Sequence, residues 1–451
     1  MAKMPTEYFE TRERALLGAQ YDARYAQDGP VRRGLTANGL RCPPAALLQA
    51  GLPLAPSPFC ETAFYITDPA FRPGLHPYHH AGAYYVQEPS AAAPAALLAV
   101  KPGERVLDVC AAPGGKASQL AAALQGKGVL VANEAMPARA QILKNNLERM
   151  GAANAVVTNE STARLAAHFS GWFDKVLVDA PCSGEGMFRK EPEALRQHSA
   201  ALVAQCAALG RTILEDAAAC VAPGGLLCYS TCTFAPEEDE GQIGAFLARH
   251  PEFSLCSLEQ FAFGSPGEAA RSPAFPFAAE KTRRIYPCHG GEGHFMALLR
   301  KEAGETARLK AFRPAKMPPA CAAFLRELFP PLSASSAAVE GASVFLPPEG
   351  LPDLGRLRVL RAGVEAGQLV KGRFEPAHGL FMAYGAACKN QETLSLEDPR
   401  TAAWLHGEEL AARTAAPGFC AVLCNGYPLG GGKMSGGRVK NRYPKGLRAL
   451  R

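Results

Sequence analysis

The chain has 451 residues, and at roughly 150 residues per domain this length predicts about three domains. With 48% hydrophobic and 20% charged residues, the composition is typical of a globular protein and excludes the disordered, collagen-like and coiled-coil classes. The net charge of +6 is modest, so its distribution along the chain says more about partners than its total does.

Export and membrane signals are missing from the sequence. No apolar run approaches the roughly 20 residues of a membrane span, and the N-terminal stretch MAKMPTEYFETRERALL lacks the apolar core of a signal peptide. We therefore expect a cytoplasmic monomer, whose 14 cysteines are reduced thiols. None of the cysteines and histidines has the paired C-x-x-C spacing of a strong zinc signal, so no metal is expected.

Before residue 303 the chain has two regions with different sequence patterns. Residues 1–95 mix short helical patterns with Pro- and Gly-rich turns, which predicts a small N-terminal module. From 96 to 302, apolar strands such as RVLDVCAA, GVLVANEA, NAVVTN, KVLVDAP and GGLLCYSTCT alternate with helical segments such as ARAQILKNNLERM. This alternation predicts an α/β, doubly wound domain, a parallel sheet with helices on both faces. Such sheets bind ligands at the carboxyl ends of their strands.

The loop after the first of these strands is rich in small residues. Small side chains let the backbone approach a ligand closely, and the start of the following helix favours negative groups. About twenty residues later Glu134 follows the second strand, where a carboxylate can accept hydrogen bonds from ribose hydroxyls. The pattern predicts a nucleoside-containing cofactor, although the loop is not a G-x-G-x-x-G fingerprint. The loop consists of Cys110, Ala111, Ala112, Pro113, Gly114, Gly115 and Lys116.

Two thiols follow neighbouring strands of the predicted sheet. The fourth strand ends at Asp179 and is followed by Cys182, and the next strand ends in YSTCTF with Cys232. Each cysteine alone is most simply explained as a small buried hydrophobe. Their occurrence at the same edge of one sheet favours a chemical role instead.

The C-terminal third of the chain also contains two regions with different sequence patterns. Residues 303–390 are rich in Pro and Ala, with a short candidate strand in ASVFLPP, and form a connecting domain. Residues 391–451 indicate a compact, mostly β module. The segment from Lys433 to Arg451 contains only basic charges, with Tyr443 interleaved. It suits a phosphate backbone, but a solvated basic tail has the same composition.

The motifs CAAPGGK, DAPCSGEGMFRK and YSTC resemble the cofactor and catalytic motifs of RNA cytosine-C5 methyltransferases of the Nol/Nop/Sun class. Within that class the chain is most similar to the bacterial RsmF/YebU-like enzymes that act on 16S ribosomal RNA. The likeness extends to YYVQEPSAAAP, RRIYPCHGGEGHFMALLRK, NGYPLGGGK and KNRYPKGLR. It implies a Rossmann-like methyltransferase core, S-adenosylmethionine as cofactor and a PUA-like C-terminal module.

The resemblance also implies roles for single residues. Residues 110–116 would hold S-adenosylmethionine, Glu134 its ribose, and Asp179 both the cofactor region and the target base. Cys232 matches the nucleophile of the family. Near the adenine, where the family commonly has an aspartate, this sequence has Ser161, with Asn159 or Glu160 as substitutes.

Cytosine C5 becomes nucleophilic only after a thiolate adds to C6, which is the chemistry that a cysteine supplies. Asp179 would accept from the exocyclic amine, or donate to N3 if protonated, while Lys116 would favour the thiolate and Cys182 would assist product release. The target base must be single-stranded or extruded from its stack. The basic segments at the two ends of the chain are the candidates for holding this strand, through Arg32, Arg33, Asn38, Lys440, Arg442, Lys445 and Arg448.

Other readings remain open on the sequence. A DNA cytosine methyltransferase would attack with the cysteine of a Pro-Cys motif, here Cys182, and an amino methyltransferase would carry Asp/Asn-Pro-Pro-aromatic where this chain has DAPC. A non-catalytic assembly factor would bind ribosomal RNA through its ends. Among RNA substrates, transfer RNA is the alternative to ribosomal RNA.

Overall fold

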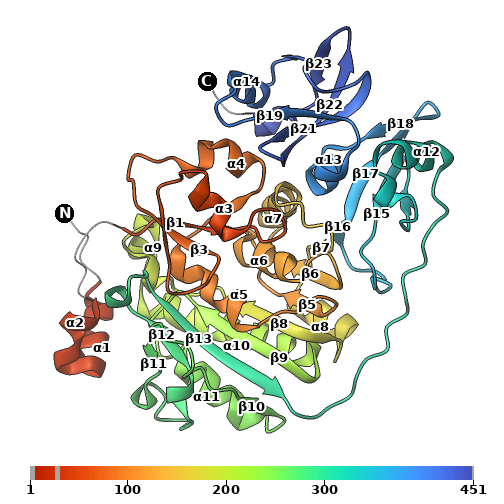
Figure 1. The fold of residues 1–451 in the computed structure, drawn as a ribbon. Helices are drawn as coiled ribbons and strands as arrows, with labels where there is room; N and C mark the ends of the chain where they lie inside the picture. The colour runs from red at the N-terminus through yellow and green to blue at the C-terminus, as the bar shows by residue number, and fades with distance from the viewer. Residues whose placement is uncertain (1–5, 26–30, 449–451) are drawn as a thin grey trace.

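The structure is a computed structural model that describes residues 6–25 and 31–448, so Arg451 lies outside the described residues. The described residues form four β-sheets, one of which is the large central sheet of the molecule (Figure 1). No helix among them is long and apolar enough to cross a membrane.

The central sheet has the strand order β11-β12-β13-β9-β8-β5-β6-β7-β16, with β10 added beside β13. From β9 to β7 neighbouring strands are parallel, and the chain order reverses at β5, with β6 and β7 on one side and β8 and β9 on the other. A reversal of this kind opens a crevice at the carboxyl ends of the strands beside β5. The strands are β5 (Arg105–Asp108), β6 (Val129–Asn133), β7 (Ala155–Thr158), β8 (Phe173–Asp179), β9 (Val221–Thr231), β10 (Phe253–Leu255), β11 (Ser265–Pro266), β12 (Arg283–Ile285), β13 (His294–Lys301) and β16 (Val359–Ala362).

Helices cover both faces of this sheet, which confirms the predicted doubly wound fold. One hydrophobic cluster joins one face to α5, α6 and α7, and a second joins the other face to α8, α10 and α11. The sequence of the long α10 explains why this helix packs on the sheet. The helix begins at the Ser199 N-cap and buries an apolar stripe of Val203, Ala207, Ile213 and Leu214. The helices are α5 (Ala93–Leu97), α6 (Gly115–Ala123), α7 (Pro137–Arg149), α8 (Thr162–Phe169), α9 (Pro192–Gln197), α10 (Ala200–Cys220) and α11 (Glu240–Arg249).

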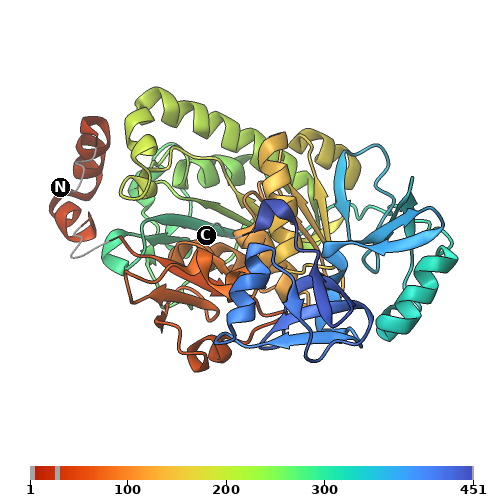
Figure 2. The ribbon, with the colours of Figure 1, turned by 90° about the horizontal axis from the view of Figure 1, so that it is seen from above.

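The N-terminal module has two parts. A four-stranded sheet of order β2-β3-β1-β4 packs beside the core, whereas α1 and α2 lie at one end of the molecule (Figures 1 and 2). Phe9 of α1 and Tyr25 of α2 pack with Phe188 and Phe234 from the core domain. The elements are α1 (Glu7–Leu17), α2 (Tyr21–Tyr25), β1 (Gly34–Ala37), α3 (Pro44–Gln49), β2 (Leu54–Pro56), β3 (Ala63–Ile66), α4 (Pro77–His80) and β4 (Tyr84–Val86).

The region 303–390 is less separate from the core than its sequence indicates. Its strand β16 pairs antiparallel with β7 and so extends the central sheet, although the alternating pattern ends near 302. A short strand that covers an exposed sheet edge carries no periodic signal of its own, so pattern alone does not reveal it. The other elements are α12 (Pro319–Leu328), β14 (Ala338–Glu340), β15 (Ser343–Leu346), β17 (Val364–Val370), β18 (Arg373–Pro376) and α13 (His378–Tyr384).

The C-terminal module is a five-stranded sheet of order β19-β21-β22-β23-β20. Its core is continuous with that of the N-terminal sheet, because Leu35 and Leu47 belong to one hydrophobic cluster with Trp404 and Val422. The N-terminal sheet and the C-terminal module therefore pack together on one side of the central domain. The elements are β19 (Gln391–Leu394), α14 (Pro399–His406), β20 (Leu410–Ala411), β21 (Gly418–Cys424), β22 (Tyr427–Ser435) and β23 (Arg438–Asn441).

Candidate active site

The small-residue loop lies where β5 ends and α6 begins. It borders a cavity of about 260 Å³ that also touches Tyr85 and Gln87 from the N-terminal module. Gly114 has φ of +115°, and a Cβ added to Gly115 would lie 2.3 Å from Gln87 Oε1. Larger residues would therefore strain or fill the cavity wall. The lining residues are Tyr85, Val86, Gln87, Ala91, Asp108, Cys110, Ala111, Ala112, Pro113, Gly115, Lys116 and Asp179.

Asp108, the last residue of β5, lines this cavity and has no role in the sequence-based prediction. Both of its carboxylate oxygens are buried and have no hydrogen-bond partner among the described residues. Burial, with the nearby charge of Asp179, raises the pKa of Asp108 to about 8. A buried carboxyl group that faces a cavity and has no side-chain partner is suited to a hydrogen-bond donor from a ligand.

Glu134 follows β6 and is buried close to the same loop. Its Oε1 accepts from the Met136 backbone N at 2.9 Å, and its Oε2 lies 3.4 Å from Arg139 Nη1. Arg139 also donates to the carbonyl oxygen of Ala112 at 3.0 Å, and so links Glu134 to the small-residue loop.

The three candidates for the adenine contact have partners within the protein. Ser161 caps α8, since its hydroxyl accepts from Arg164 N, and Asn159 donates to the carbonyl oxygens of Glu134 and Ala135. Glu160 accepts from Arg358 N at 2.6 Å. None of Ser161, Asn159 and Glu160 lines the two cavities beside the loop of residues 110–116.

The two thiols meet where β8 and β9 end. Cys182 Sγ lies 3.2 Å from Cys232 Sγ, and the Cys232 backbone N–H donates to Cys182 Sγ at 3.3 Å. Both face a cavity of about 540 Å³ that also contains Asp179 and Lys116. Its hydrogen bond with Cys232, together with burial, raises the pKa of Cys182 well above its ordinary value, so Cys182 stays a protonated thiol at neutral pH.

An ion pair lies beside the thiols. Lys116 Nζ is 2.8 Å from Asp179 Oδ2, and Ser230 Oγ donates to Asp179 Oδ1 at 2.7 Å. Burial would raise the pKa of Asp179, but Lys116 and these hydrogen bonds hold it below its ordinary value. Burial would lower the pKa of Lys116, whereas Asp179 and Cys232 raise it. An ionised Asp179 accepts hydrogen bonds, so of its two expected roles the structure favours acceptance from an amine.

Glu185, three residues after Cys182, ties the two thiol-bearing loops together. Its carboxylate accepts from Phe234 N, two residues after Cys232, at 3.1 Å. Arg12 of α1 binds the same carboxylate through two hydrogen bonds, and His198 Nε2 lies 2.8 Å from it. The motif CSGEG contains Glu185, but sequence alone gives no sign that α1 reaches it.

A second chain of polar groups reaches the cavity from the opposite side. His294, the first residue of β13, lines the cavity with Cys232 and Asp179, and its Nδ1 lies 3.0 Å from Ser90 Oγ. Ser90 in turn donates to Glu88. These three residues lie in YYVQEPSAAAP and CHGGEGH, two segments that carry the family resemblance but no predicted role.

The N-terminal candidates for RNA contact differ from one another. Arg32 is exposed and lies over the Tyr65 ring, while the Arg33 guanidinium donates to the carbonyl oxygens of Pro69 and Phe71. Asn38 is 2% exposed, and its amide donates to two backbone carbonyls. Its prediction as an RNA contact is wrong for the side chain, because the buried amide donates to Gly82 O within the N-terminal module and to Met150 O at the end of α7.

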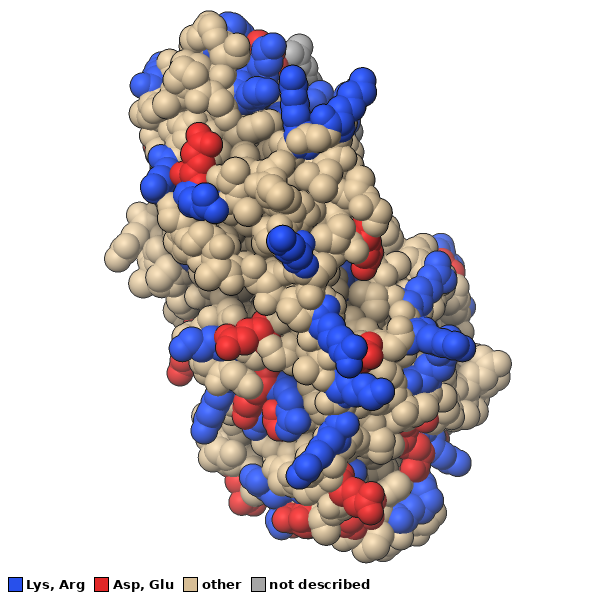
Figure 3. All heavy atoms as spheres, turned by 90° about the vertical axis from the view of Figure 1, so that its right-hand side faces the viewer, with Lys and Arg blue, Asp and Glu red and all other residues tan. Residues whose placement is uncertain are grey.

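At the C-terminus, lysine and arginine side chains gather at the end of the molecule formed by the C-terminal module (Figure 3). Lys440 and Lys445 are exposed, whereas Arg442 pairs with Glu375 at 3.0 Å. Arg448 is half-buried. Tyr443, interleaved in the sequence, is 3% exposed, because its ring packs into the core shared with the N-terminal sheet.

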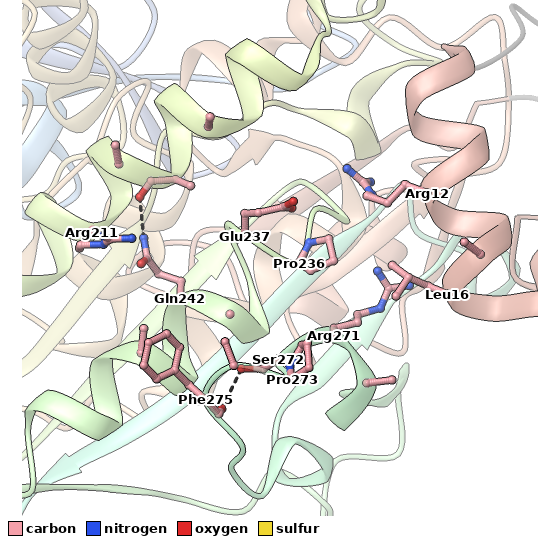
Figure 4. Close-up of a pocket in the computed structure, with 18 residues that line it drawn as sticks. Arg12, Leu16, Arg211, Pro236, Glu237, Gln242, Arg271, Ser272, Pro273 and Phe275 are labelled. Carbon is pink, nitrogen blue, oxygen red and sulfur yellow. Dashed lines mark hydrogen bonds between the residues drawn. The ribbon is translucent and has the colours of Figure 1, made fainter.

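A larger cavity of about 710 Å³ lies between α1, α10 and α11 (Figure 4). Arg12 and Arg271 lie at the end of the cavity beside α1, and Phe275 lines the other end. It contains none of the residues that the sequence predicts for cofactor, base or RNA contact.

Comparison with known proteins matches every part of this architecture. The family profile of 16S rRNA methyltransferase RsmB/F matches residues 95–300. Profiles of the RsmF N-terminal domain, first C-terminal domain and PUA domain match residues 4–89, 323–384 and 391–449. The ribosomal RNA small subunit methyltransferase F of Klebsiella pneumoniae is 32% identical over 93% of this chain and 90% of its own length. That of Aeromonas hydrophila is 32% identical over 93% and 91%.

The chain belongs to the RsmF branch of the RsmB/F methyltransferase family. A methyltransferase homolog from Pyrococcus horikoshii, 30% identical, has a similar structure, with a TM-score of 0.58 over 66% of this chain and 95% of that one. NSun6 from the same organism, solved with SFG, shares the fold at 20% identity and a TM-score of 0.55 over 66% of this chain and 99% of that one. Family membership confirms the predicted RNA methyltransferase class, the S-adenosylmethionine dependence and the PUA-like module.

Proposed function

We propose that this RsmF-family enzyme methylates C5 of a cytosine in 16S ribosomal RNA, with Cys232 as nucleophile, and that it acts as a monomer in the cytoplasm. The supporting observation is the placement of two thiols 3.2 Å apart beside the Lys116–Asp179 ion pair, at the carboxyl ends of β8 and β9.

The cavity beside β5 fits S-adenosylmethionine. The unpartnered Asp108 carboxyl offers an acceptor to an ammonium or hydroxyl group, and the N-terminus of α6 offers backbone N–H groups to a carboxylate. Residues 110–116 and Asp108 would hold the cofactor, and Glu134, which Arg139 links to this loop, would accept from its ribose hydroxyls. When bound, it supplies the electrophilic methyl group.

In the proposed reaction, the Cys232 thiolate forms a bond to C6, and the electron pair of the C5–C6 double bond becomes available at C5. Lys116 lines the same cavity as Cys232, so its positive charge lies near the sulfur that attacks. The ionised Asp179 accepts from the exocyclic amine, which uracil lacks, and so favours cytosine.

Release of the product requires the C5 proton to pass to a solvent water, so that the C5–C6 double bond re-forms as the bond between Cys232 and C6 breaks. Cys182 stays protonated next to Cys232, so its S–H can donate to the departing thiolate and stabilise it. Cys182 therefore assists elimination, while Cys232 performs the attack.

The proposal is tested by bisulfite sequencing of ribosomal RNA from cells with and without the protein. We expect one or more 16S cytosines to lose methylation when the gene is deleted, and to regain it on complementation. Unchanged ribosomal cytosines would contradict the proposal and make transfer RNA the next substrate to examine.

Glu134→Ala tests the proposed ribose contact. Loss of the buried acceptor should weaken S-adenosylmethionine binding by about 1–3 kcal/mol in calorimetric titration. The thermal unfolding midpoint of the variant serves as control, because Glu134 also accepts from Met136 N. Unchanged affinity would remove Glu134 from the cofactor site.

The C-terminal module is proposed to bind RNA phosphates through its exposed lysines. Replacing both Lys440 and Lys445 by alanine should lower the slope of log K against log salt by about 1.4 to 1.8, at 0.7 to 0.9 per phosphate contact. The matched control replaces Lys101 and Lys127, which are exposed and precede β5 and β6 at the opposite ends of the strands. Equal slopes for the two double variants would show that the C-terminal lysines are only solvated surface.

A further inference from the structure

The polar chain Glu88–Ser90–His294 fixes the hydrogen on one particular nitrogen of His294. Glu88 accepts backbone hydrogen bonds from Ala91 N and Glu292 N, so its carboxylate acts as an acceptor. Ser90 donates its single hydroxyl hydrogen to that carboxylate. The Ser90 oxygen can then only accept from His294, which places the imidazole hydrogen on Nδ1. Nε2 is left as an acceptor.

The position of His294 brings its acceptor nitrogen, Nε2, close to the proposed site of the target base. In the sheet register Phe295 pairs with Thr231, so His294 lies beside Cys232 at the ends of adjacent strands. His294, Cys232 and Asp179 line the same cavity. Burial, together with the charge of Lys116, lowers the pKa of His294 to about 4, so the imidazole is neutral at physiological pH.

We propose that His294 is a specificity-determining residue that accepts, through Nε2, a hydrogen bond from the exocyclic amine of the target cytosine. The amine has two N–H groups, and Asp179 and His294 provide an acceptor for each. Uracil has an oxygen acceptor in place of the amine, and two acceptors facing it repel. This inference rests on the proposed function, because it concerns the base that Cys232 attacks.

The same nitrogen could instead remove the C5 proton. A neutral imidazole whose pKa lies near 4 is a weak proton acceptor, but its lone pair still accepts a hydrogen bond. The structure therefore favours recognition of the amine over base catalysis.

The experiment uses RNA fragments that contain the cytosine identified by bisulfite sequencing, or uracil or pyrimidin-2-one at that position. Pyrimidin-2-one lacks only the exocyclic amine. Dissociation constants are measured in the Cys232→Ala background, in which no covalent adduct forms. We expect the preference for cytosine over pyrimidin-2-one to fall by about tenfold in His294→Asn, which retains a group near Ser90 but has none at Nε2. His294→Gln, which can place an amide oxygen near Nε2, should restore part of it.

Ser90→Ala provides an independent readout. Without the Ser90 acceptor the hydrogen is no longer held on Nδ1, so the variant should gain affinity for uracil relative to cytosine. S-adenosylmethionine affinity should be unchanged in all of these variants, which shows that the site is folded.

Two results would overturn the inference. One is an unchanged preference for cytosine in His294→Asn with cofactor binding intact. The other is a methylated covalent adduct that accumulates when His294→Asn is made in the enzyme with Cys232 present, since that would assign proton removal to His294. If the enzyme with no substitution fails to methylate the cytosine fragment, the proposed function fails instead.

Discussion

Cys232→Ala should abolish both methyl transfer and any covalent RNA adduct, whereas Cys182→Ala should make a methylated adduct accumulate. The first substitution removes the thiolate that adds to C6. The second removes only the S–H group that stabilises the departing thiolate, so attack and methyl transfer continue while release slows. Each loss should exceed about a hundredfold in turnover, since a covalent intermediate cannot form or cannot resolve.

The measurement is incubation of each variant with substrate RNA and labelled S-adenosylmethionine, followed by denaturing electrophoresis. A slower band that ribonuclease removes identifies the adduct. Cys206→Ala is the matched control, because Cys206 is a partly buried thiol on α10 that belongs to neither the 260 Å³ nor the 540 Å³ cavity. A trapped band with Cys232→Ala and none with Cys182→Ala would reverse the two roles. Cys182 would then be the nucleophile, as the cysteine of the Pro-Cys motif is in DNA cytosine methyltransferases.

The sequence predicts the parts of this site that follow strands. Cys110, Asp179, Cys182 and Cys232 each lie just beyond the end of an apolar run, and parallel strands bring such positions to one edge of a sheet. The same reasoning recovers the doubly wound core, because its strands are buried on both faces and appear as continuous apolar runs.

The parts of the site that the sequence does not predict depend on contacts between segments far apart in the chain. Ser90 lies 204 residues from His294, and Arg12 lies 173 residues from Glu185. No periodicity records such a contact, and a buried charge or hydroxyl looks like an ordinary polar residue in the sequence. Tyr443 gives a further example, since it lies among basic residues of a predicted phosphate-binding segment, whereas the fold buries its ring.

Loss of the contact between α1 and the thiol loops should have large effects on both stability and methyl transfer. Glu185→Ala should lower the free energy of unfolding by about 3–5 kcal/mol, because Arg12 loses a carboxylate partner in a buried ion pair. It should also abolish methyl transfer, since Glu185 joins the loop after Cys182 to the loop after Cys232. Urea unfolding and single-turnover methylation measure the two effects. Glu193→Ala is the control for the unfolding measurement alone, because the Glu193 side chain is 56% exposed and its loss should change stability by less than about 0.5 kcal/mol.

The pH dependence of the free energy of unfolding distinguishes the contribution of the Glu185 charge from that of its packing. Burial alone would raise the pKa of Glu185, but hydrogen bonds from His198 and Arg12 lower it from 4.5 to about 2. A depressed carboxyl pKa contributes stability above the unfolded value, and this contribution is lost as pH falls from about 4.5 towards about 2. Glu185→Gln cannot titrate, so its stability relative to the unsubstituted enzyme should recover over that interval. A constant difference between the two proteins from pH 6 to the acid limit of folding would mean that the Glu185 carboxylate contributes packing and not charge.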